Sequence, residues 1–203
     1  MLHGYSRRGL NPLNVYRLSA PVTKKMLTQL RSGDQVLISG VVYTARDAAH
    51  KRLYRLLAQG QQLPVDLRGQ IIYYTGPTPA KPSAITGSIG PTTSYRMDPY
   101  TPALLEYGVK VIMGKGSRSQ SVKDALIQWK GVYLAAIGGA AALLAKSVTS
   151  CQVVAYADLG PEAIRRLEVV DFPAIVVNDT YGNDLYLEGV RRYRKESQDD
   201  GKD

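Results

Sequence analysis

The chain has 203 residues, 44% hydrophobic and 21% charged, which is the composition of a soluble globular protein with one substantial domain. No apolar run approaches the roughly 20 residues that cross a bilayer, and the first residues lack the apolar core of a secretion signal, so we expect a cytoplasmic protein. The single cysteine, Cys151, excludes an internal disulfide and a cysteine-ligated metal cluster built from this chain alone, and two histidines give little support to any other metal site.

The net charge is positive, because lysine and arginine exceed aspartate and glutamate by 26 − 17 = 9. A basic surface is often simply solvated, but it also attracts anions, either nucleic acids or small acidic substrates. Nucleic-acid binding gains little support, since the chain has one Phe and one Trp, and its fourteen tyrosines are not interleaved with a basic run. Part of the excess lies near the C-terminus, where "RRYRKES" precedes the acidic "QDDGKD".

The first half of the chain predicts a strand, a helix and two short strands, in residues 34–45, 46–60, 69–76 and 83–90. The first segment is rich in β-branched residues and fits one long strand or a strand pair. The helix shows apolar residues at helical spacing and is closed by Gly60. Asp98-Pro99 is typical of the start of a further helix, which ends at Gly108.

The second half alternates strands and helices. We predict strands in residues 109–114, 132–137, 151–160, 167–179 and 182–189, and helices in 121–131 and 138–148. Alternation in the middle and strand pairs at both ends predict an α/β domain with a mixed sheet. We assign residues 1–13 to an N-terminal extension, 14–190 to this domain, and 191–203 to a basic and then acidic tail that is disordered at its end.

The stretch "YTARDAAH" places a cation where a helix begins. Thr44 and Asp47 fit the spacing of a capping box, so capping alone could explain both residues. Arg46 lies in the first turn, where the helix dipole disfavours a positive charge. An anion held between Arg46 and the free amides would account for that placement, and a solvent-facing arginine is the alternative.

A second cation follows in "GSIGPTTSYRMDPYTP". Thr92, Thr93 and Arg96 lie between a strand end and a helix start, where α/β proteins tend to bind ligands. Two hydroxyls and a guanidinium suit a carboxylate or phosphate. The alternative is a turn whose threonines bond the local backbone.

The third cation, Lys115, stands between glycines in "MGKGS", which lacks the spacing of a Walker A loop. An ammonium group beside bare amides at a strand end still suits one anion. Gly138 and Gly139 could offer amides at a helix start, although close helix packing is the better explanation for them. Arg46, Arg96 and Lys115 together suit a substrate with two anionic ends.

Four stretches give the sequence a family resemblance: "GDQVLISGVVYTARDAAHKRL", "GPTTSYRMDPYTPALLEYGVKVIMGKG", "GGAAALLA" and "DFPAIVVNDTYGNDLY". Over roughly residues 14–190 the chain resembles the β subunit, or C-terminal domain, of the class I fumarate hydratase and L-tartrate dehydratase family. The resemblance implies a swivelling β/β/α-type domain that closes over a cluster-bearing α subunit, with an α₂β₂ assembly natural for the family. It also implies a [4Fe–4S] cluster carried by that partner, with no metal bound by this chain.

By the same resemblance, the chain's residues have assigned roles. The substrate-contacting positions of the family match Arg46, Thr92, Thr93, Arg96 and Lys115. Arg96 and Lys115 would hold carboxylates, and Thr92 is the candidate for proton transfer, for which it needs activation by a neighbour.

Three functions are compared. The first is the β subunit of a fumarate hydratase, which hydrates fumarate reversibly to (S)-malate and is inactive without its α subunit. The second is the β subunit of L(+)-tartrate dehydratase, whose pocket accepts one more hydroxyl. The third is a non-catalytic protein that binds small anions or RNA, with an affinity that falls steeply as salt rises.

Overall fold

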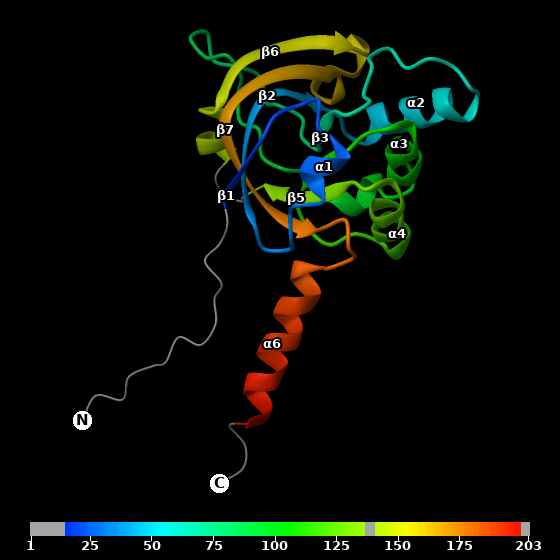
Figure 1. Ribbon diagram of the computed structural model, residues 1–203. Coiled ribbons are helices and arrows are strands. Elements are labelled where there is room, and N and C mark those ends of the chain that lie inside the picture. Colours follow the sequence, from blue (N-terminus) through cyan, green and yellow to red (C-terminus); the bar gives the residue numbers. More distant parts are fainter. Residues whose placement is uncertain (1–14, 137–140, 200–203) are drawn as a thin grey trace.

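The computed structural model describes residues 15–136 and 141–199, and a seven-stranded sheet forms its centre. The strands are β1 (Val15–Leu18), β2 (Gln35–Thr44), β3 (Ile71–Tyr73), β4 (Val111–Gly114), β5 (Val132–Ala136), β6 (Val148–Ala155) and β7 (Ile164–Asn178). The helices are α1 (Lys24–Leu27), α2 (Asp47–Ala58), α3 (Thr101–Tyr107), α4 (Gln120–Trp129), α5 (Ala141–Ala145) and α6 (Leu185–Asp199), with two 3₁₀-helices, η1 (Ser94–Met97) and η2 (Ala157–Glu162). Figure 1 shows the strands rolled around a centre, with α2, α3 and α4 stacked along one side. The predicted mixed α/β domain is confirmed.

The sheet closes on itself at β2. Its strand order is β1-β2-β3-β4-β5-β7-β6, and β2 pairs additionally with β7. Strands β2, β3, β4 and β5 run parallel, and β7 runs antiparallel to both β2 and β5. The five strands therefore form a closed ring, with β1 beside β2 and β6 beside β7. As a result, the carboxyl ends of four parallel strands meet at one end of the ring.

Alternate residues of the parallel strands serve two separate cores. Ile71 and Tyr73 face the inside of the ring, whereas Ile72 and Tyr74 face the helices. All three residues of β3 and all four of β4 are buried, as expected for strands covered on both faces. On the helix side, Leu53 of α2 is among the buried residues that complete the second core.

The segment 83–90, predicted as a strand, forms no strand. It belongs to an irregular loop between β3 and η1 whose two arms are tied together, since Thr78 N–H donates to the Ser88 carbonyl (3.0 Å) and Ser88 N–H donates to the Thr78 hydroxyl (2.8 Å). A Cβ at Gly87 would collide with the Thr78 carbonyl oxygen, so only glycine permits this approach. This tied loop, which requires glycine at position 87, therefore takes the place of the predicted strand.

The predicted helix start at Asp98 is also wrong. Helix α3 begins at Thr101, and Asp98 closes the 3₁₀-helix η1 instead. Its carboxylate accepts hydrogen bonds from Arg118 Nε (2.8 Å) and from the Ser119 amide (2.6 Å). Asp98 thus connects η1 to the start of α4 rather than capping its own helix.

The segment 182–189, predicted as a strand, is the start of helix α6. Asp184 accepts from the backbone amides of Tyr186 (3.0 Å) and Leu187 (3.3 Å), which satisfies two free donors of the first turn. The helix continues past position 190, the predicted end of the domain, and extends away from the sheet in Figure 1. None of the helices within the described residues combines the length and hydropathy that crossing a bilayer requires.

Candidate functional site

The candidate site lies where β2, β3 and β4 end. Arg46 follows β2 and Lys115 follows β4, and the loop that carries Thr92 and Thr93 crosses between them. The Thr92 amide donates to the carbonyl of Tyr74 just past β3 (2.7 Å), and Thr93 forms a parallel bridge with Lys115. The backbone of this loop therefore pairs with the residues that directly follow β3 and β4. This pairing fixes the positions of Thr92 and Thr93 at that end of the sheet.

Arg46 occupies the N-cap position of α2 with an extended backbone. Its Nη2 lies 3.7 Å from Asp47 Oδ2 and 3.7 Å from Glu162 Oε1, distances of an ion pair but not of a hydrogen bond. Its buried Nε has no hydrogen-bond partner among the described residues. The guanidinium is therefore held between two carboxylates, and its Nη groups form no hydrogen bond with the described residues.

An anion does lie at the start of α2, and it comes from the chain itself. Glu162, at the end of η2, accepts a hydrogen bond from the Ala48 amide (2.8 Å) and pairs with Arg46. A carboxylate at this position offsets the positive end of the helix dipole, which makes the neighbouring cation less costly. Sequence reasoning missed Glu162, because nothing near it in the chain indicates its contact with α2.

Asp47 brings the two predicted arginines together. Its Oδ1 lies 2.7 Å from Arg96 Nε, and its Oδ2 is the atom paired with Arg46. The capping-box interpretation is therefore wrong: the Thr44 hydroxyl accepts from the Arg165 amide (3.1 Å) on β7 rather than capping α2. Asp47 instead sets the spacing of two guanidinium groups.

Thr92, Thr93 and Lys115 carry polar side chains at the same edge of the sheet. None of the three forms a side-chain hydrogen bond or ion pair with the residues the structure describes, and Lys115 is exposed. The interpretation in which the threonines bond the local backbone through their hydroxyls is therefore not what the structure has. Two hydroxyls and an ammonium group are left available at the edge that also carries the two arginines.

A buried polar network supports this loop from below. Ser94 Oγ lies 3.0 Å from the Tyr133 hydroxyl, which donates to the Gly116 carbonyl (2.8 Å). Burial raises the pKa of Tyr133, so the hydroxyl keeps the proton that it donates. A Cβ at Gly114 would collide with Ser94 Oγ, which explains the glycine before Lys115.

Arg118 is the buried cation of that network, and sequence analysis missed it. Its side chain is fully buried, pairs with Asp98 and donates to Thr101 Oγ1 (3.0 Å). Its guanidinium carbon lies 4.9 Å from the ring centroid of Tyr133 and 5.3 Å from that of Tyr74, close enough for cation–π attraction. The signal that could have identified it is its position. Arg118 lies in the short connection between β4 and α4, so it does not belong to the solvent-facing side of a helix.

His50 lies under Arg46 on the next turn of α2. The ring is fully buried, stacks edge-on against Tyr74 at 5.0 Å, and donates from Nδ1 to the Arg46 carbonyl (2.9 Å). Burial lowers the pKa of His50 to about 4, although the bond to the Arg46 carbonyl opposes that shift. The imidazole is therefore neutral near pH 7 and belongs to the packing beneath the site.

The described residues offer no ligand set for a metal. Nowhere in residues 15–136 and 141–199 do three His, Cys, Asp or Glu side chains gather closely enough to hold an ion. Cys151 is a free thiol on β6, paired in register with Leu167 rather than with any site residue. The predicted amides of Gly138 and Gly139 lie outside the described residues.

Sequence comparison places this geometry in a family. The sequence model of the family described as fumarase C-terminus matches residues 7–189, about nine-tenths of the chain. The chain belongs to the fumarase C-terminal family. The resemblance seen in the four stretches above is confirmed.

Named relatives fall into two groups by length. The anaerobic class I fumarate hydratase of Escherichia coli K12 is 41% identical over 174 residues, which cover 83% of this chain but 32% of that protein. A Geobacillus stearothermophilus protein with the provisional name fumarate hydratase class I is 41% identical over 177 residues, covering 85% of this chain and 34% of its own length. The chain thus spans about a third of these class I relatives. By contrast, a Methanocaldococcus jannaschii protein provisionally named L(+)-tartrate dehydratase subunit beta is 42% identical over 173 residues, covering 82% of this chain and 89% of that protein.

Proposed function

We propose that this chain is the β subunit of a two-subunit class I fumarate hydratase, which hydrates fumarate reversibly to (S)-malate. The observation that carries the proposal is the meeting of Arg46 and Arg96 at Asp47, on the edge that also bears Lys115. The family membership and the class I names of relatives about 40% identical support the reaction.

The three cations suit a dicarboxylate. Arg96 uses only Nε in its pair with Asp47, so its two Nη groups can form a bidentate contact with one carboxylate. Lys115, which follows β4, would hold the other carboxylate. The Nη groups of Arg46 form no hydrogen bond with the described residues, and they would bind the carboxylate nearer to α2, where removal of the adjacent proton builds negative charge.

Thr92 is the proposed proton-transfer residue. Its hydroxyl has no hydrogen-bond partner within the described part of the chain, so none of the described side chains is in place to activate it. A free threonine hydroxyl is a poor base near neutral pH, and efficient proton transfer needs a group whose pKa lies near the working pH. We therefore assign the activating group, and the remaining acid–base chemistry, to the partner subunit.

The [4Fe–4S] cluster of the class is proposed on the same partner. The residues of this chain do not fit it: Cys151 is the only cysteine, and no set of three ligands is present in the described residues. We propose a cluster-bearing α subunit, an α₂β₂ assembly in the cytoplasm, and a swivelling β/β/α-type domain that closes over the cluster. The length of the M. jannaschii relative supports a separate β chain, because this chain covers 89% of it.

The second candidate is the β subunit of L(+)-tartrate dehydratase. That same relative favours it, since it bears the tartrate name and matches nearly end to end. Both substrates are C4 dicarboxylates, so Arg46, Arg96 and Lys115 would serve either. The difference lies in whether the pocket accepts a second hydroxyl group.

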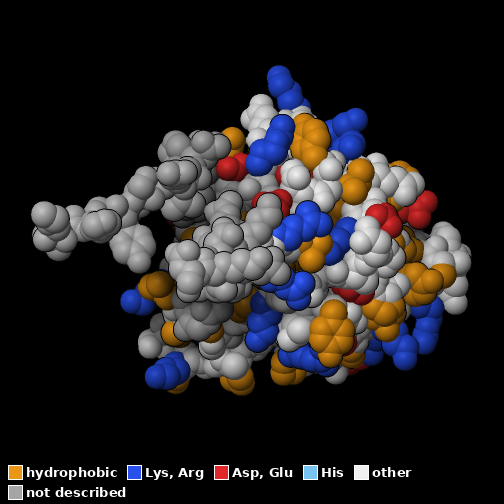
Figure 2. All heavy atoms as spheres, turned by 90° about the horizontal axis from the view of Figure 1, so that it is seen from below, with side chains coloured by type: hydrophobic (Ala, Val, Ile, Leu, Met, Phe, Trp, Pro, Cys, Tyr) orange, Lys and Arg blue, Asp and Glu red, His pale blue; other side chains and the backbone are white. Residues whose placement is uncertain are grey.

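The non-catalytic alternative draws on the positive net charge. On the face seen in Figure 2, Lys and Arg side chains are scattered, with hydrophobic and some acidic side chains between them. A nucleic-acid groove would favour a continuous basic stripe. We therefore retain the hydro-lyase as the proposed function.

The test is reconstitution with the cluster-bearing subunit encoded in the same host. The two chains are co-expressed, purified without oxygen, and supplied with (S)-malate while fumarate absorbance is followed, with L-tartrate in parallel. Turnover of malate that requires both chains supports the fumarase proposal, and turnover of tartrate alone supports the second candidate. No turnover of either substrate by a stable complex with an intact cluster overturns both.

A further inference from the structure

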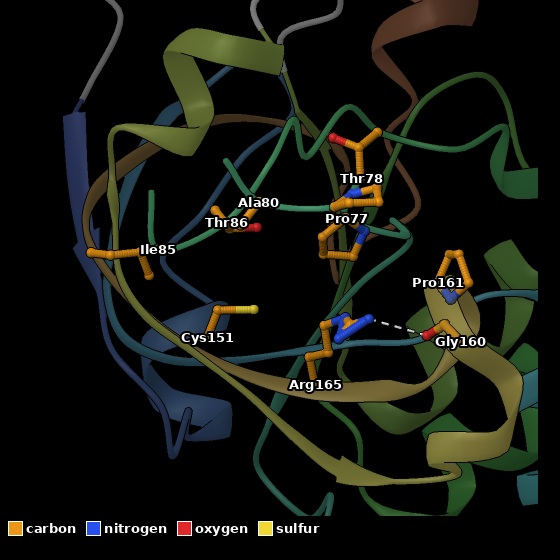
Figure 3. Close-up of a pocket in the computed structure, with 10 residues that line it drawn as sticks. Pro77, Thr78, Ala80, Ile85, Thr86, Cys151, Gly160, Pro161 and Arg165 are labelled. Carbon is orange, nitrogen blue, oxygen red and sulfur yellow. Dashed lines mark hydrogen bonds between the residues drawn. The ribbon is translucent and has the colours of Figure 1, made fainter. Parts of the chain in front are cut away.

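A hollow of about 420 Å³ lies outside the candidate site, between the loop that follows β3 and the outer strands β6 and β7. Figure 3 shows the loop residues on one side of it and Cys151 and Arg165 on the other. Its walls are largely apolar and include Pro77, Ile85 and Pro161. A cavity of this size accommodates a small organic molecule.

Two polar groups on these walls have no partner. Arg165 donates from Nη2 to the Gly160 carbonyl (3.1 Å), but its buried Nε–H has no acceptor among the described residues. The hydroxyl of Thr86, a residue only 9% exposed, is likewise buried without a hydrogen bond. A buried donor without a partner is destabilising, so the hollow favours an occupant that brings acceptors.

Cys151 places a thiol on the same wall. It pairs in register with Leu167, and Val153, two residues on, pairs with Arg165. Cys151 and Arg165 are therefore diagonal neighbours on one face of the β6–β7 ladder, roughly 7–8 Å apart at their backbones. A molecule of a few heavy atoms can reach from the thiol to the guanidinium.

The hollow is separate from the candidate site but adjoins it. Gly160 and Pro161 line the hollow, and the next residue, Glu162, is the one that holds Arg46. A Cβ on Gly76 would lie 2.8 Å from the Pro161 carbonyl oxygen and 3.0 Å from Arg46 Cδ, which shows how closely the two regions pack. None of Thr86, Cys151 and Arg165 belongs to the proposed substrate-binding set.

We propose that this hollow binds a small monocarboxylic acid with a short apolar body. The carboxylate accepts from Arg165 Nε and from the Thr86 hydroxyl, and the apolar body covers Pro77, Ile85 and Pro161. One guanidinium and one hydroxyl suit a single negative charge, whereas phosphate would need more donors than these walls offer.

The unique cysteine makes a direct test possible. Iodoacetate and iodoacetamide both alkylate Cys151 on the full chain: Sγ attacks the methylene carbon, the carbon–iodine bond breaks, iodide leaves, and the thiol proton passes to buffer. The ratio of the two rates cancels the reactivity of the thiol itself and reports only on attraction of the carboxylate. A charge-assisted hydrogen bond contributes about 1.5–3 kcal/mol, so we expect the iodoacetate/iodoacetamide ratio to be about 10-fold or more higher in the native chain than in the urea-unfolded chain.

Matched variants assign the effect to Arg165. Arg165→Gln should return the ratio to that of the unfolded chain, whereas Arg166→Gln removes the same charge one residue away, at a side chain paired with Glu168, and should leave the ratio unchanged. If Arg165→Gln fails to fold, Arg165→Lys keeps the charge without the planar Nε and should lower the ratio. Equal ratios in native and unfolded wild-type chain, or equal losses in both glutamine variants, overturn the proposal.

Protection by the free acid is the second measurement. Butyrate should slow iodoacetamide labelling of Cys151 in a saturable manner, and Thr86→Val, which keeps the shape without the hydroxyl, should weaken that protection. Inorganic phosphate should not protect. Equal protection by phosphate would mean a simple anion site, and no protection by butyrate would mean an empty hollow, and either result contradicts the proposal.

Discussion

Two arginine–aspartate pairs near the candidate site have the same length and different surroundings. Arg118 and Asp98 approach to 2.7 Å with side chains 0% and 11% exposed, and Arg96 and Asp47 approach to 2.7 Å with side chains 46% and 28% exposed. The contact distance alone therefore does not distinguish a residue that holds the fold from one that meets a ligand.

What differs is how many donors each guanidinium has left and where they face. Arg118 donates from Nε to Asp98 and from Nη2 to Thr101 and lies against two aromatic rings, and its remaining Nη1, which has no acceptor among the described residues, is buried. Arg96 pairs with Asp47 through Nε alone, and its side chain is 46% exposed, so its Nη groups can contact a ligand. The buried pair fixes the loop, and the exposed pair presents a cation on it.

The largest expected effect comes from breaking the buried pair. Asp98→Ala leaves Arg118 charged and unpaired in a dry environment, and we expect a loss of about 3–5 kcal/mol in the free energy of unfolding, measured by urea denaturation. Asp47→Ala, the matched change in the exposed pair, should cost about 1 kcal/mol or less. Equal losses in the two variants would contradict the distinction between the pairs.

The second effect concerns pH and the same buried layer. His50 has a folded-state pKa of about 4, below its usual value of 6.5, so the unfolded chain binds a proton that the folded chain excludes. Stability from this group is complete above about pH 6.5 and is lost as the pH falls towards 4, by about 3 kcal/mol in all. The measurement is the free energy of unfolding at pH 7 and at pH 4.5.

Other carboxylates also titrate in that range, so the control is a variant. His50→Asn keeps a donor for the Arg46 carbonyl but has no titrating ring. Its stability should fall less than that of the wild type between the two pH values. The same pH dependence in both chains would show that His50 contributes nothing to it.

The third effect belongs to the exposed pair and rests on the proposed function. Arg96→Ala removes a charge-assisted contact worth about 1.5–3 kcal/mol, so kcat/KM of the reconstituted enzyme should fall about 10- to 100-fold. Stability should change by about 0.5 kcal/mol or less, because the side chain is half exposed. Arg96→Lys keeps the charge but lacks the planar guanidinium, so its kcat/KM should lie between those of the wild type and Arg96→Ala. A large loss of stability with unchanged kcat/KM would assign Arg96 to the fold instead.

The sequence predicted the elements whose signals are local. β2, α2, β4, α4 and β7 follow from runs of β-branched residues and from apolar spacing. The elements that were wrong depend on distant contacts or on close backbone approach, as at Gly87, where the Thr78 carbonyl leaves no room for a side chain. A single sequence does not record such neighbours.

The positions of the three cations at element ends were predictable, but most of the groups that pair with the buried and half-buried arginines were not. Arg46, Arg96 and Lys115 stand out because each is a charged residue at the end of an element. Glu162 contacts the Ala48 amide across 114 residues of chain, and Arg118 reaches Asp98 across 20. Their roles come from the closure of the sheet and from the loop laid across it, which only the folded chain brings together.

The smallest expected effect tests how Arg46 is held. Glu162→Gln keeps an oxygen acceptor for the Ala48 amide and removes the charge 3.7 Å from Arg46, so stability should change by about 0.5 kcal/mol or less. Glu162→Ala removes the acceptor as well and should cost about 1 kcal/mol, comparable to the loss of a helix cap. Urea denaturation of the two variants side by side separates the two contributions. If the glutamine variant loses as much as the alanine variant, the charge and not the hydrogen bond fixes this end of α2, and Arg46 belongs with Arg118 among the cations whose counter-charge the fold requires.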